Sequence, residues 1–327
     1  MTETPKSIAD LIKKSQSFLI TSHIDPDGDA VGCQIAIYSV LKRLGKTAKV
    51  VCEDGVPASY AFLEGARDVL LVPIEPCDVA IVVDAGALDR TGWVSEIVKR
   101  CGTVINIDHH RSNDRFGTYN LVEMEAGACG EIVYRVLSEL GVGFERSEAE
   151  ALYVAILSDT GCFRFPTTTA ETLDIAAHLL RVGVRPYHVA SEIYWQKSFA
   201  SLKILGTALS SVEVSPDGKI ATMEVTRGMY RDSGATGIDT DGFANYPRSI
   251  DGVVIGVLLR ETDQGHFRVS LRAAEGYDVD AVAKAFGGGG HATAAGFRIE
   301  GDLAAIKAKV REQIRSHLRN LEQAAGP

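Results

Sequence analysis

The sequence feature that most limits the fold is an acidic turn at residues 22–32, SHIDPDGDAVG, which contains one histidine and three aspartates. The apolar run Phe18-Leu19-Ile20 precedes this turn and is typical of a buried strand. Apolar residues then recur at helical spacing from Val31 to Leu41, before Gly45. We therefore expect the turn to join the C-terminal end of a strand to the start of a helix, where open α/β sheets bind ligands.

The charge of this turn requires an explanation. Neighbouring carboxylates repel one another and resist burial, so a fold that gathers them either supplies cations or leaves them in water. Asp, Pro and Gly are also ordinary turn residues, so the turn taken alone is better explained as a solvated loop. Further acidic sites elsewhere in the chain favour the first explanation.

Two later apolar segments also end in polar, chemically active residues. Residues 79–83 are continuously apolar and are followed by Asp84, and residues 103–107 are followed by the sequence Asp-His-His at 108–110. Such strands, alternating with helices, predict a parallel sheet covered on both faces. The C-terminal ends of parallel strands lie at one edge of the sheet, so the polar residues are expected to converge there.

Asp159 follows a helical segment at 147–157 and is expected to join this group. A mixed set of imidazoles and carboxylates suits two borderline-hard divalent ions that share a bridging carboxylate. An all-thiolate zinc site is excluded, because the six cysteines form no CxxC pair. Each residue alone is also explained as an ordinary turn or loop residue.

Length, charge and cysteine content limit the class of protein. A chain of 327 residues is expected to form two domains. The net charge of −9 argues against a general binder of long nucleic acid, which needs a basic track. The cysteines are interpreted as reduced and buried. The N-terminus lacks a signal-peptide pattern and no apolar run is long enough to span a membrane, so we expect a cytoplasmic protein.

The second half of the chain has a different pattern. Residues 189–211 form one long helical pattern, interpreted as a connector, and strand pairs with short turns follow at 211–225 and 252–271. A helix at 279–286 leads into four consecutive glycines, and a helix at 303–321 follows. The predicted fold class is α/β, with a catalytic parallel-sheet domain at 1–188, the connector, and a smaller mixed α/β substrate domain at 212–327.

The glycine run Gly287-Gly288-Gly289-Gly290 precedes His291. Consecutive glycines leave backbone N–H groups unshielded, which suits close approach of an anion and is favoured here over the alternative of a flexible loop after a helix. An arginine fork matches a phosphate bidentately. We therefore assign Arg260, Arg272 and His291 to a terminal phosphate of the substrate, with Arg248 preceding them. The predicted substrate-binding residues are Arg248, Arg260, Arg272, Gly288, Gly289, Gly290 and His291.

Taken together, these motifs resemble those of the DHH phosphoesterases. The resemblance rests on His23-x-x-Pro26-Asp27-x-Asp29-x-x-Gly32, strand-end Asp84, Asp108-His109-His110 and Asp159, and on Gly287–His291 with Ala294-Ala295-Gly296 for the partner domain DHHA1. It covers nearly the whole chain, with five motifs in order. Position 33 is Cys where the family commonly has Ser, a departure that removes no ligand.

The resemblance implies a ligand set. His23 and Asp27 hold one ion, Asp29, His109 and Asp159 hold the other, and Asp84 bridges both. Two divalent ions are implied, Mn²⁺ first, with Mg²⁺ or Co²⁺ as alternatives. Asp25 and Asp108 are expected to contact the ligand residues without binding the ions themselves, with Asp108 orienting a ligand imidazole. His110 is expected to act in catalysis beside Asp84.

The resemblance is greatest to two-domain bacterial enzymes that degrade very short RNA to mononucleotides and remove the 3′-phosphate of pAp. The expected partners are short single-stranded RNA and nucleotides, not long duplexes and not membranes, and a homodimer is expected from the resemblance alone. The alternatives are a cyclic-dinucleotide phosphodiesterase, an inorganic pyrophosphatase built on the same first domain, and a nucleotide sensor that binds without cutting. A sensor would be expected to lack a metal ligand, and all six are present.

Overall fold

The structure is a computed structural model that describes residues 3–240 and 242–324 of the chain. The chain divides into two compact units, Met1–Gln196 and Lys197–Pro327, called here the first and second unit. Within the described residues, no helix is long and apolar enough to span a membrane.

The first unit is built on a five-stranded sheet in the order β2-β1-β3-β4-β5, with every pair of neighbours parallel. This confirms the predicted parallel sheet. The strands are β1 (Ser17–Thr21), β2 (Thr47–Val50), β3 (Val79–Val83), β4 (Thr103–Asp108) and β5 (Tyr119–Val122). The prediction missed β5, because four residues of mixed burial are too short to show a clear period.

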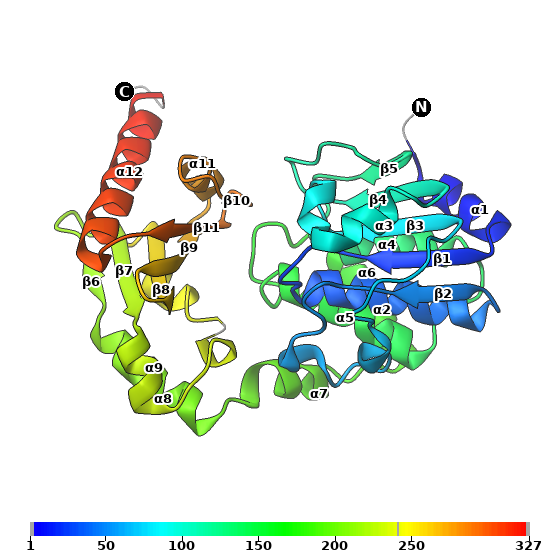
Figure 1. The fold of residues 1–327 in the computed structure, drawn as a ribbon, viewed down its shortest axis with the longest axis horizontal. Helices are drawn as coiled ribbons and strands as arrows, with labels where there is room; N and C mark the ends of the chain where they lie inside the picture. Colours follow the sequence, from blue (N-terminus) through cyan, green and yellow to red (C-terminus); the bar gives the residue numbers. More distant parts are fainter. Residues whose placement is uncertain (1–2, 241, 325–327) are drawn as a thin grey trace. The chain divides into compact units, whose positions relative to one another are not determined.

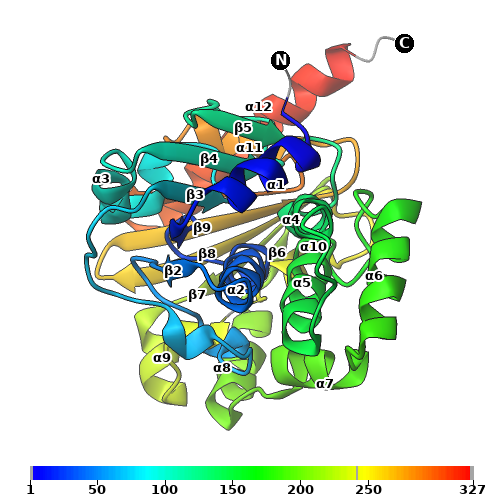
Figure 2. The same cartoon turned by 90° about the vertical axis from the view of Figure 1, so that its right-hand side faces the viewer.

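Helices cover both faces of this sheet, as Figures 1 and 2 show. On one face, alternate residues such as Phe18, Ile81 and Ile107 pack against five helices. These are α1 (Pro5–Lys14), α2 (Gly28–Arg43), α4 (Cys129–Ser138), α5 (Arg146–Asp159) and α6 (Ala170–Val182). On the other face, Leu19 and Val82 pack against the 3₁₀ segment Leu88–Val94 and α3 (Ser95–Val98). Short 3₁₀ turns also occur at Ala58–Tyr60 and Ala66–Asp68.

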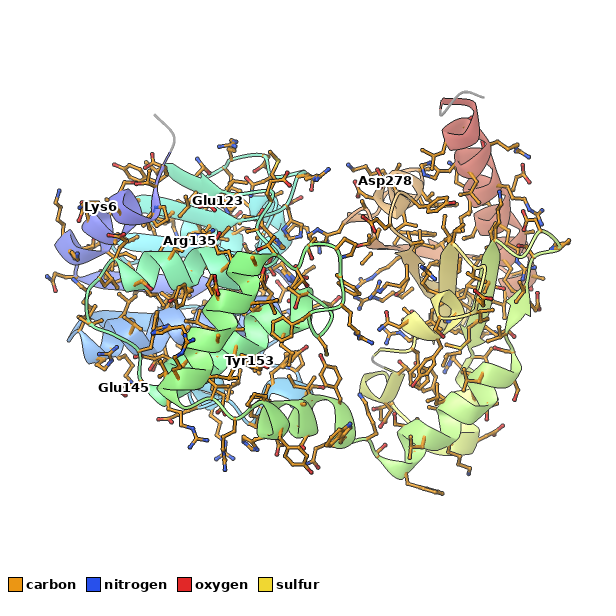
Figure 3. All side chains as sticks on the ribbon, turned by 180° about the vertical axis from the view of Figure 1, so that it is seen from behind. Lys6, Glu123, Arg135, Glu145, Tyr153 and Asp278 are labelled. Carbon is orange, nitrogen blue, oxygen red and sulfur yellow. The ribbon has the colours of Figure 1, made fainter. Side chains whose placement is uncertain are left out.

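Two contacts fix the helices that carry the site. Helices α2 and α5 touch at Gly32, where a side-chain Cβ would lie 2.3 Å from the carbonyl oxygen of Ala151. Arg135 of α4 forms ion pairs with Glu123, just after β5, and with Glu171 of α6; Figure 3 labels Arg135 and Glu123. The first contact sets the spacing of α2 and α5, and the second ties α4 to its neighbours.

The single connector helix predicted at 189–211 is interrupted. The structure has α7 (Pro186–Ala190), a π-helical segment at Ser191–Trp195, and a separate helix α8 (Phe199–Ser210). The break follows from a new cap, because the Ser198 side chain accepts a hydrogen bond from the Ser201 amide and starts α8. The two compact units meet in sequence at this break.

The second unit is built on a mixed sheet of six strands, in the order β10-β11-β9-β8-β7-β6. The strands are β6 (Glu213–Val214), β7 (Ile220–Val225), β8 (Ile255–Asp263), β9 (His266–Ala273), β10 (Gly289–Gly290) and β11 (Ala294–Glu300). Among the described residues of this sheet, only the β7–β8 pair is parallel. Both predicted strand pairs, 211–225 and 252–271, occur as antiparallel hairpins.

The two faces of the second sheet are covered differently. One face, with Leu259, Val269 and Phe297, packs against α11 (Val279–Lys284) and α12 (Leu303–Ala324). Asp278, labelled in Figure 3, caps the start of α11. On the other face, Met223 and Leu258 pack against α8. The remaining helices are α9 (Arg227–Ser233), α10 (Asn245–Arg248) and a 3₁₀ turn at Ile238–Thr240.

Candidate metal centre

The acidic turn is shaped by the start of α2. Asp27 is the N-cap of that helix, because its Oδ1 accepts the amides of Asp29 (3.0 Å) and Ala30 (3.1 Å). Asp29 lies in the first turn and is fully buried. Its two oxygens accept the amides of Cys129 (2.6 Å) and Gly130 (2.9 Å) at the start of α4. The Asp29 carboxylate therefore lies between the N-termini of α2 and α4, and helix N-termini favour negative charge.

Asp84 follows β3 with a left-handed backbone (φ 53°), a conformation that Asp adopts more readily than most residues. Its side chain is almost fully buried and faces three imidazoles. Asp84 Oδ2 lies 3.5 Å from His23 Nε2, and Oδ1 lies 3.6 Å from His109 Nε2 and 3.7 Å from His110 Nδ1. Asp84 is thus the central carboxylate of the group.

Two of the imidazoles are oriented by backbone carbonyls. His23 Nδ1 lies 2.7 Å from its neighbour's carbonyl, that of Ile24, and His109 Nδ1 lies 3.1 Å from the carbonyl of Ala126. A carbonyl only accepts, so in both rings Nδ1 carries the hydrogen, and each Nε2 lone pair is available to a metal. Both Nε2 atoms face the carboxylates.

Asp108 contacts the imidazole of His110 and not that of the predicted ligand His109. Its Oδ1 lies 2.7 Å from Nδ1 of His110, which was not predicted as a ligand. Asp108 is the last residue of β4, and the two histidines that follow it both face Asp84 Oδ1. Asn113, which the sequence analysis missed, donates to Asp108 Oδ2 at 2.5 Å and holds the carboxylate in place.

The predicted ligands gather into overlapping triplets. His23, Asp27 and Asp84 offer ligand atoms within 4.8 Å of one another, and so do Asp29, Asp84 and His109. Asp159, at the C-terminal end of α5, brings Oδ2 to 3.3 Å from His109 Nε2. The structure therefore brings together all six predicted metal ligands, and Asp84 is shared between the two triplets.

The donor set fits divalent ions. Asp84 Oδ1 is buried and has no hydrogen-bond partner among the described residues. A buried carboxylate oxygen without a donor is costly unless a cation satisfies it. Imidazole and carboxylate together match Mn²⁺ and similar ions better than a site for soft metals.

In the metal-free protein, protons take the place of the cations. Burial disfavours charged imidazoles, but Asp84 and Asp27 outweigh it at His23 and raise its pKa to about 9. At His109, Asp159, Asp84 and Asp29 outweigh burial in the same way and raise the pKa to about 10. Burial also raises the pKa of the Asp159 carboxyl to about 7. The metal-free site therefore binds protons, and metal binding must release them.

Asp25 stands apart from the ligand triplets. Its backbone is left-handed (φ 52°), and its amide donates to the side chain of Asp54 at 2.7 Å. Asp54 was not predicted, and no sequence pattern links it to the turn. The contact fixes the bend that directs the preceding His23 toward Asp84.

The predicted phosphate residues of the second unit lie in two places on one sheet face. Arg272 of β9 is opposite Gly256 of β8 and Ala294 of β11, and Ala294 closes a tight turn with His291. The backbone of Arg248 packs directly on Gly256. Arg272, Arg248 and His291 therefore belong to one end of the face. Arg260 is further along and donates to Thr240 Oγ1 and the Gly237 carbonyl.

The glycine run has a structural purpose that the sequence did not reveal. Gly289 and Gly290 form β10 and pair with β11, and a Cβ at Gly288 would lie 2.2 Å from the carbonyl oxygen of Gly296. The amides of Gly287 and Gly288 donate within the turn, and the amide of Gly290 donates to Asp280. These three amides are therefore already bonded, contrary to the expected open anion cradle, and the glycines instead allow close strand packing before His291.

Comparisons with known families agree with the division of the chain into two units. The description "DHH family, N-terminal domain" matches residues 17–156, and "DHHA1 domain" matches residues 217–316. The first match contains five of the six predicted ligands, and Asp159 lies three residues beyond its end.

Curated relatives align over most of the chain. A Thermus thermophilus protein named "Bifunctional oligoribonuclease and PAP phosphatase NrnA" is 33% identical over 97% of this chain and 95% of its own length. A Bacillus subtilis protein of the same name is 24% identical over 86% of this chain and 89% of its own length.

Solved structures show the same fold. An exopolyphosphatase-related protein from Bacteroides fragilis has a TM-score of 0.91 and 26% identity, and the match covers 97% of this chain and 98% of that one. RecJ from Thermus thermophilus, solved with Mn²⁺, has a TM-score of 0.53 and 15% identity, and the match covers 95% of this chain and 55% of RecJ.

Proposed function

This chain belongs to the DHH family, and from that premise we propose that it is a metal-dependent phosphoesterase that hydrolyses short RNA oligonucleotides to mononucleotides and converts pAp to AMP. The observation that carries the proposal is the convergence of two histidines and three further aspartates around the shared carboxylate of Asp84. The names of the relatives from Thermus and Bacillus supply the substrate class.

The two triplets suggest how metals would be held. His23 and Asp27 would bind one ion, Asp29, His109 and Asp159 would bind the second, and Asp84 would bind both. Mn²⁺ is the proposed ion, with Mg²⁺ or Co²⁺ as alternatives, because the donors are nitrogen and oxygen. When bound, two such ions supply a hydroxide at neutral pH and neutralise charge on the phosphoryl oxygens.

His110 is the proposed proton donor to the leaving oxygen. Its Nδ1 is held by Asp108, which is itself held by Asn113, so the ring has one orientation. Burial opposes protonation of His110, but Asp108 and Asp84 outweigh it and raise its pKa. A protonated imidazole can donate its proton to the leaving group or stabilise the developing negative charge.

The proposed substrate domain, residues 212–327, would bind a terminal phosphate through Arg272 and His291, with Arg248 beside them. The catalytic domain would comprise residues 1–188, and residues 189–211 would form the connector between the two domains. Arginine suits this role because its planar fork matches phosphate oxygens bidentately. The glycines 288–290 would act by positioning His291, since the Gly288 and Gly290 amides are already bonded.

The rival functions differ in what they require. A pyrophosphatase would release no AMP from pApA, and a sensor does not need a complete ligand set. A cyclic-dinucleotide phosphodiesterase would act on a substrate that has no terminal phosphate, so it would gain nothing from Arg272 and His291.

Metal dependence and product identity test the proposal together. Protein stripped with EDTA and then reloaded with Mn²⁺ should convert the 5′-phosphorylated dinucleotide pApA to AMP, and pAp to AMP and phosphate. Asp159→Asn is expected to abolish both reactions, because it removes a ligand next to His109. If the reloaded protein binds pApA but releases no mononucleotide, the enzyme proposal is wrong.

A further inference from the structure

The chain turns back just after the proposed ligand Asp159, in the segment that joins α5 to α6 (Figure 1). Three consecutive residues, Gly161, Cys162 and Phe163, have left-handed backbones with φ of 56°, 61° and 60°. A helix commonly ends with one left-handed glycine, and left-handed residues with bulky side chains are strained. Strain of this kind gathers at binding and catalytic sites, so the turn calls for a functional explanation.

Thr160 holds the end of this turn in place. Its carbonyl oxygen accepts the amides of Arg164 and Phe165, both at 3.0 Å. Arg164 also donates from Nε to the carbonyl oxygen of Gly161 at 2.6 Å. The position of Phe165 is therefore tied to the residue that directly follows Asp159.

The turn places two phenylalanines in different surroundings. Phe163 is half-buried and packs against the core beside Tyr153, with 6.0 Å between the ring centroids. Phe165 is 37% exposed, and the tip of its ring lies against Gly161, where a Cβ would come within 2.5 Å of Cζ. Glycine at position 161 is therefore needed to make room for the ring. The aromatic ring is held in one place while part of it stays open to solvent.

A second exposed apolar side chain lies on the neighbouring loop. Met124 is 48% exposed and follows β5, at the sheet edge where the proposed ligands gather. In the same loop, the carbonyl of Ala126 orients the imidazole of His109. This loop meets the segment after α5, because a Cβ at Gly127 would lie 2.7 Å from the carbonyl oxygen of Thr167. Two touching loops, each fixed to a proposed metal ligand, thus carry exposed apolar side chains.

We propose that Phe165 and Met124 form a platform for a nucleobase of the substrate, next to the phosphate that is hydrolysed. The inference rests on the proposed function. A single exposed apolar side chain needs no ligand, but here a strained turn fixes an aromatic ring close in the chain to Asp159. Every base has an aromatic face and methionine adapts to different shapes, so the platform accepts any base. It supplies affinity for the nucleoside without selecting a sequence.

The test compares pAp with a ligand that lacks the base. Methyl riboside 3,5-bisphosphate keeps both phosphates and the closed sugar ring and carries a methoxy group in place of adenine. Phe165→Ala should raise KM for pAp by roughly 5- to 150-fold, the loss of one base–aromatic stack, and leave KM for the methyl riboside within about twofold. The uridine 3′,5′-bisphosphate should respond in the same direction as pAp. Met124→Ala should give a smaller rise.

Further variants separate stacking from side-chain bulk and from folding. Phe165→Tyr keeps an aromatic face and should keep KM for pAp near the wild-type value, whereas Phe165→Leu keeps apolar bulk and should not. Tyr187→Ala is the matched control, because it removes an aromatic ring that is 74% exposed on α7, and it should leave KM for both ligands unchanged. Phe165→Ala should retain as much Mn²⁺ as wild-type protein after dialysis.

Three outcomes overturn the inference. An unchanged KM for pAp in Phe165→Ala would remove the ring from substrate binding. Equal rises for pAp and the methyl riboside, or loss of Mn²⁺, would show that Phe165 positions Asp159 and does not contact a base. Full activity of Phe165→Leu would rule out stacking. Failure of the proposed function is distinct, because wild-type protein would then hydrolyse neither pApA nor pAp. The same two ligands would in that case be compared by Kd from calorimetry, with the same expected ratios.

Discussion

Replacing Asp84 by asparagine tests whether one carboxylate serves two metals. The substitution keeps the shape of the side chain and removes its charge. Asp84 lies within 3.5–3.7 Å of nitrogen atoms in His23, His109 and His110, and it belongs to both ligand triplets. Asp27, by contrast, belongs to the triplet with His23 and Asp84 and not to the triplet with Asp29 and His109. Asp27→Asn is therefore the matched control.

The magnitude follows from charge balance. Asp27, Asp29, Asp84 and Asp159 together offset the charge of two divalent ions, and Asp84→Asn leaves one buried positive charge uncompensated. Removing one partner of a buried charge pair costs about 3–5 kcal/mol. Since about 1.4 kcal/mol is a factor of ten, Mn²⁺ affinity should fall by roughly two to nearly four orders of magnitude.

The assay is metal content after equilibrium dialysis against micromolar Mn²⁺, with activity measured in parallel. The wild-type protein should retain two ions, Asp27→Asn one, and Asp84→Asn neither. In the metal-free state, NMR titration should also show the pKa of His23 and His109 falling in Asp84→Asn by about 1–3 units, the usual effect of an opposite charge at this distance. If Asp84→Asn retains one ion, as Asp27→Asn does, the carboxylate does not bridge.

Three further predictions concern protons, catalysis and packing. Because His23 and His109 have raised pKa values of about 9 and about 10 without metal, protons compete with Mn²⁺, so affinity should rise with pH up to that range. Calorimetry in two buffers of different ionisation enthalpy should show about two protons released at pH 7.5, and no release would contradict the assignment. His110→Gln should keep both ions and lower kcat about 10²–10⁴-fold, and loss of an ion would instead make His110 a ligand. Gly32→Ala should destabilise the first unit by about 1–3 kcal/mol in urea unfolding, because its Cβ meets the Ala151 carbonyl, whereas Gly206→Ala, with nothing within 4 Å, should stabilise α8 by about 0.5–1 kcal/mol.

The convergence of polar residues at one sheet edge was accessible from sequence because strand direction determines it, whereas the individual ligands followed from the family resemblance. Apolar runs before His23, Asp84 and Asp108 showed that several strands end in polar residues, and parallel strands bring such ends to one edge. Asp108 instead pairs with His110, which lies beyond the end of β4, where the strand pattern makes no prediction. The prediction wrongly gave that support to a ligand imidazole.

Other parts of the site could not be inferred. The carbonyl that orients His109 belongs to Ala126, 17 residues away, and backbone groups leave no signature in the side-chain pattern. The amides that hold Asp29 come from the start of α4, about 100 residues later. The glycines at 287–290 carry no side chain, so their sequence cannot distinguish a free loop from strand β10.

The most direct test of the central claim is a comparison of Mn²⁺-dependent kcat/KM for pApA, pAp, cyclic di-AMP and pyrophosphate, measured side by side with wild-type protein and Asp84→Asn. The account predicts AMP from pApA and from pAp, slower turnover of cyclic di-AMP, and loss of all activity in the variant. Turnover of pyrophosphate alone, or activity that survives in Asp84→Asn, would contradict it.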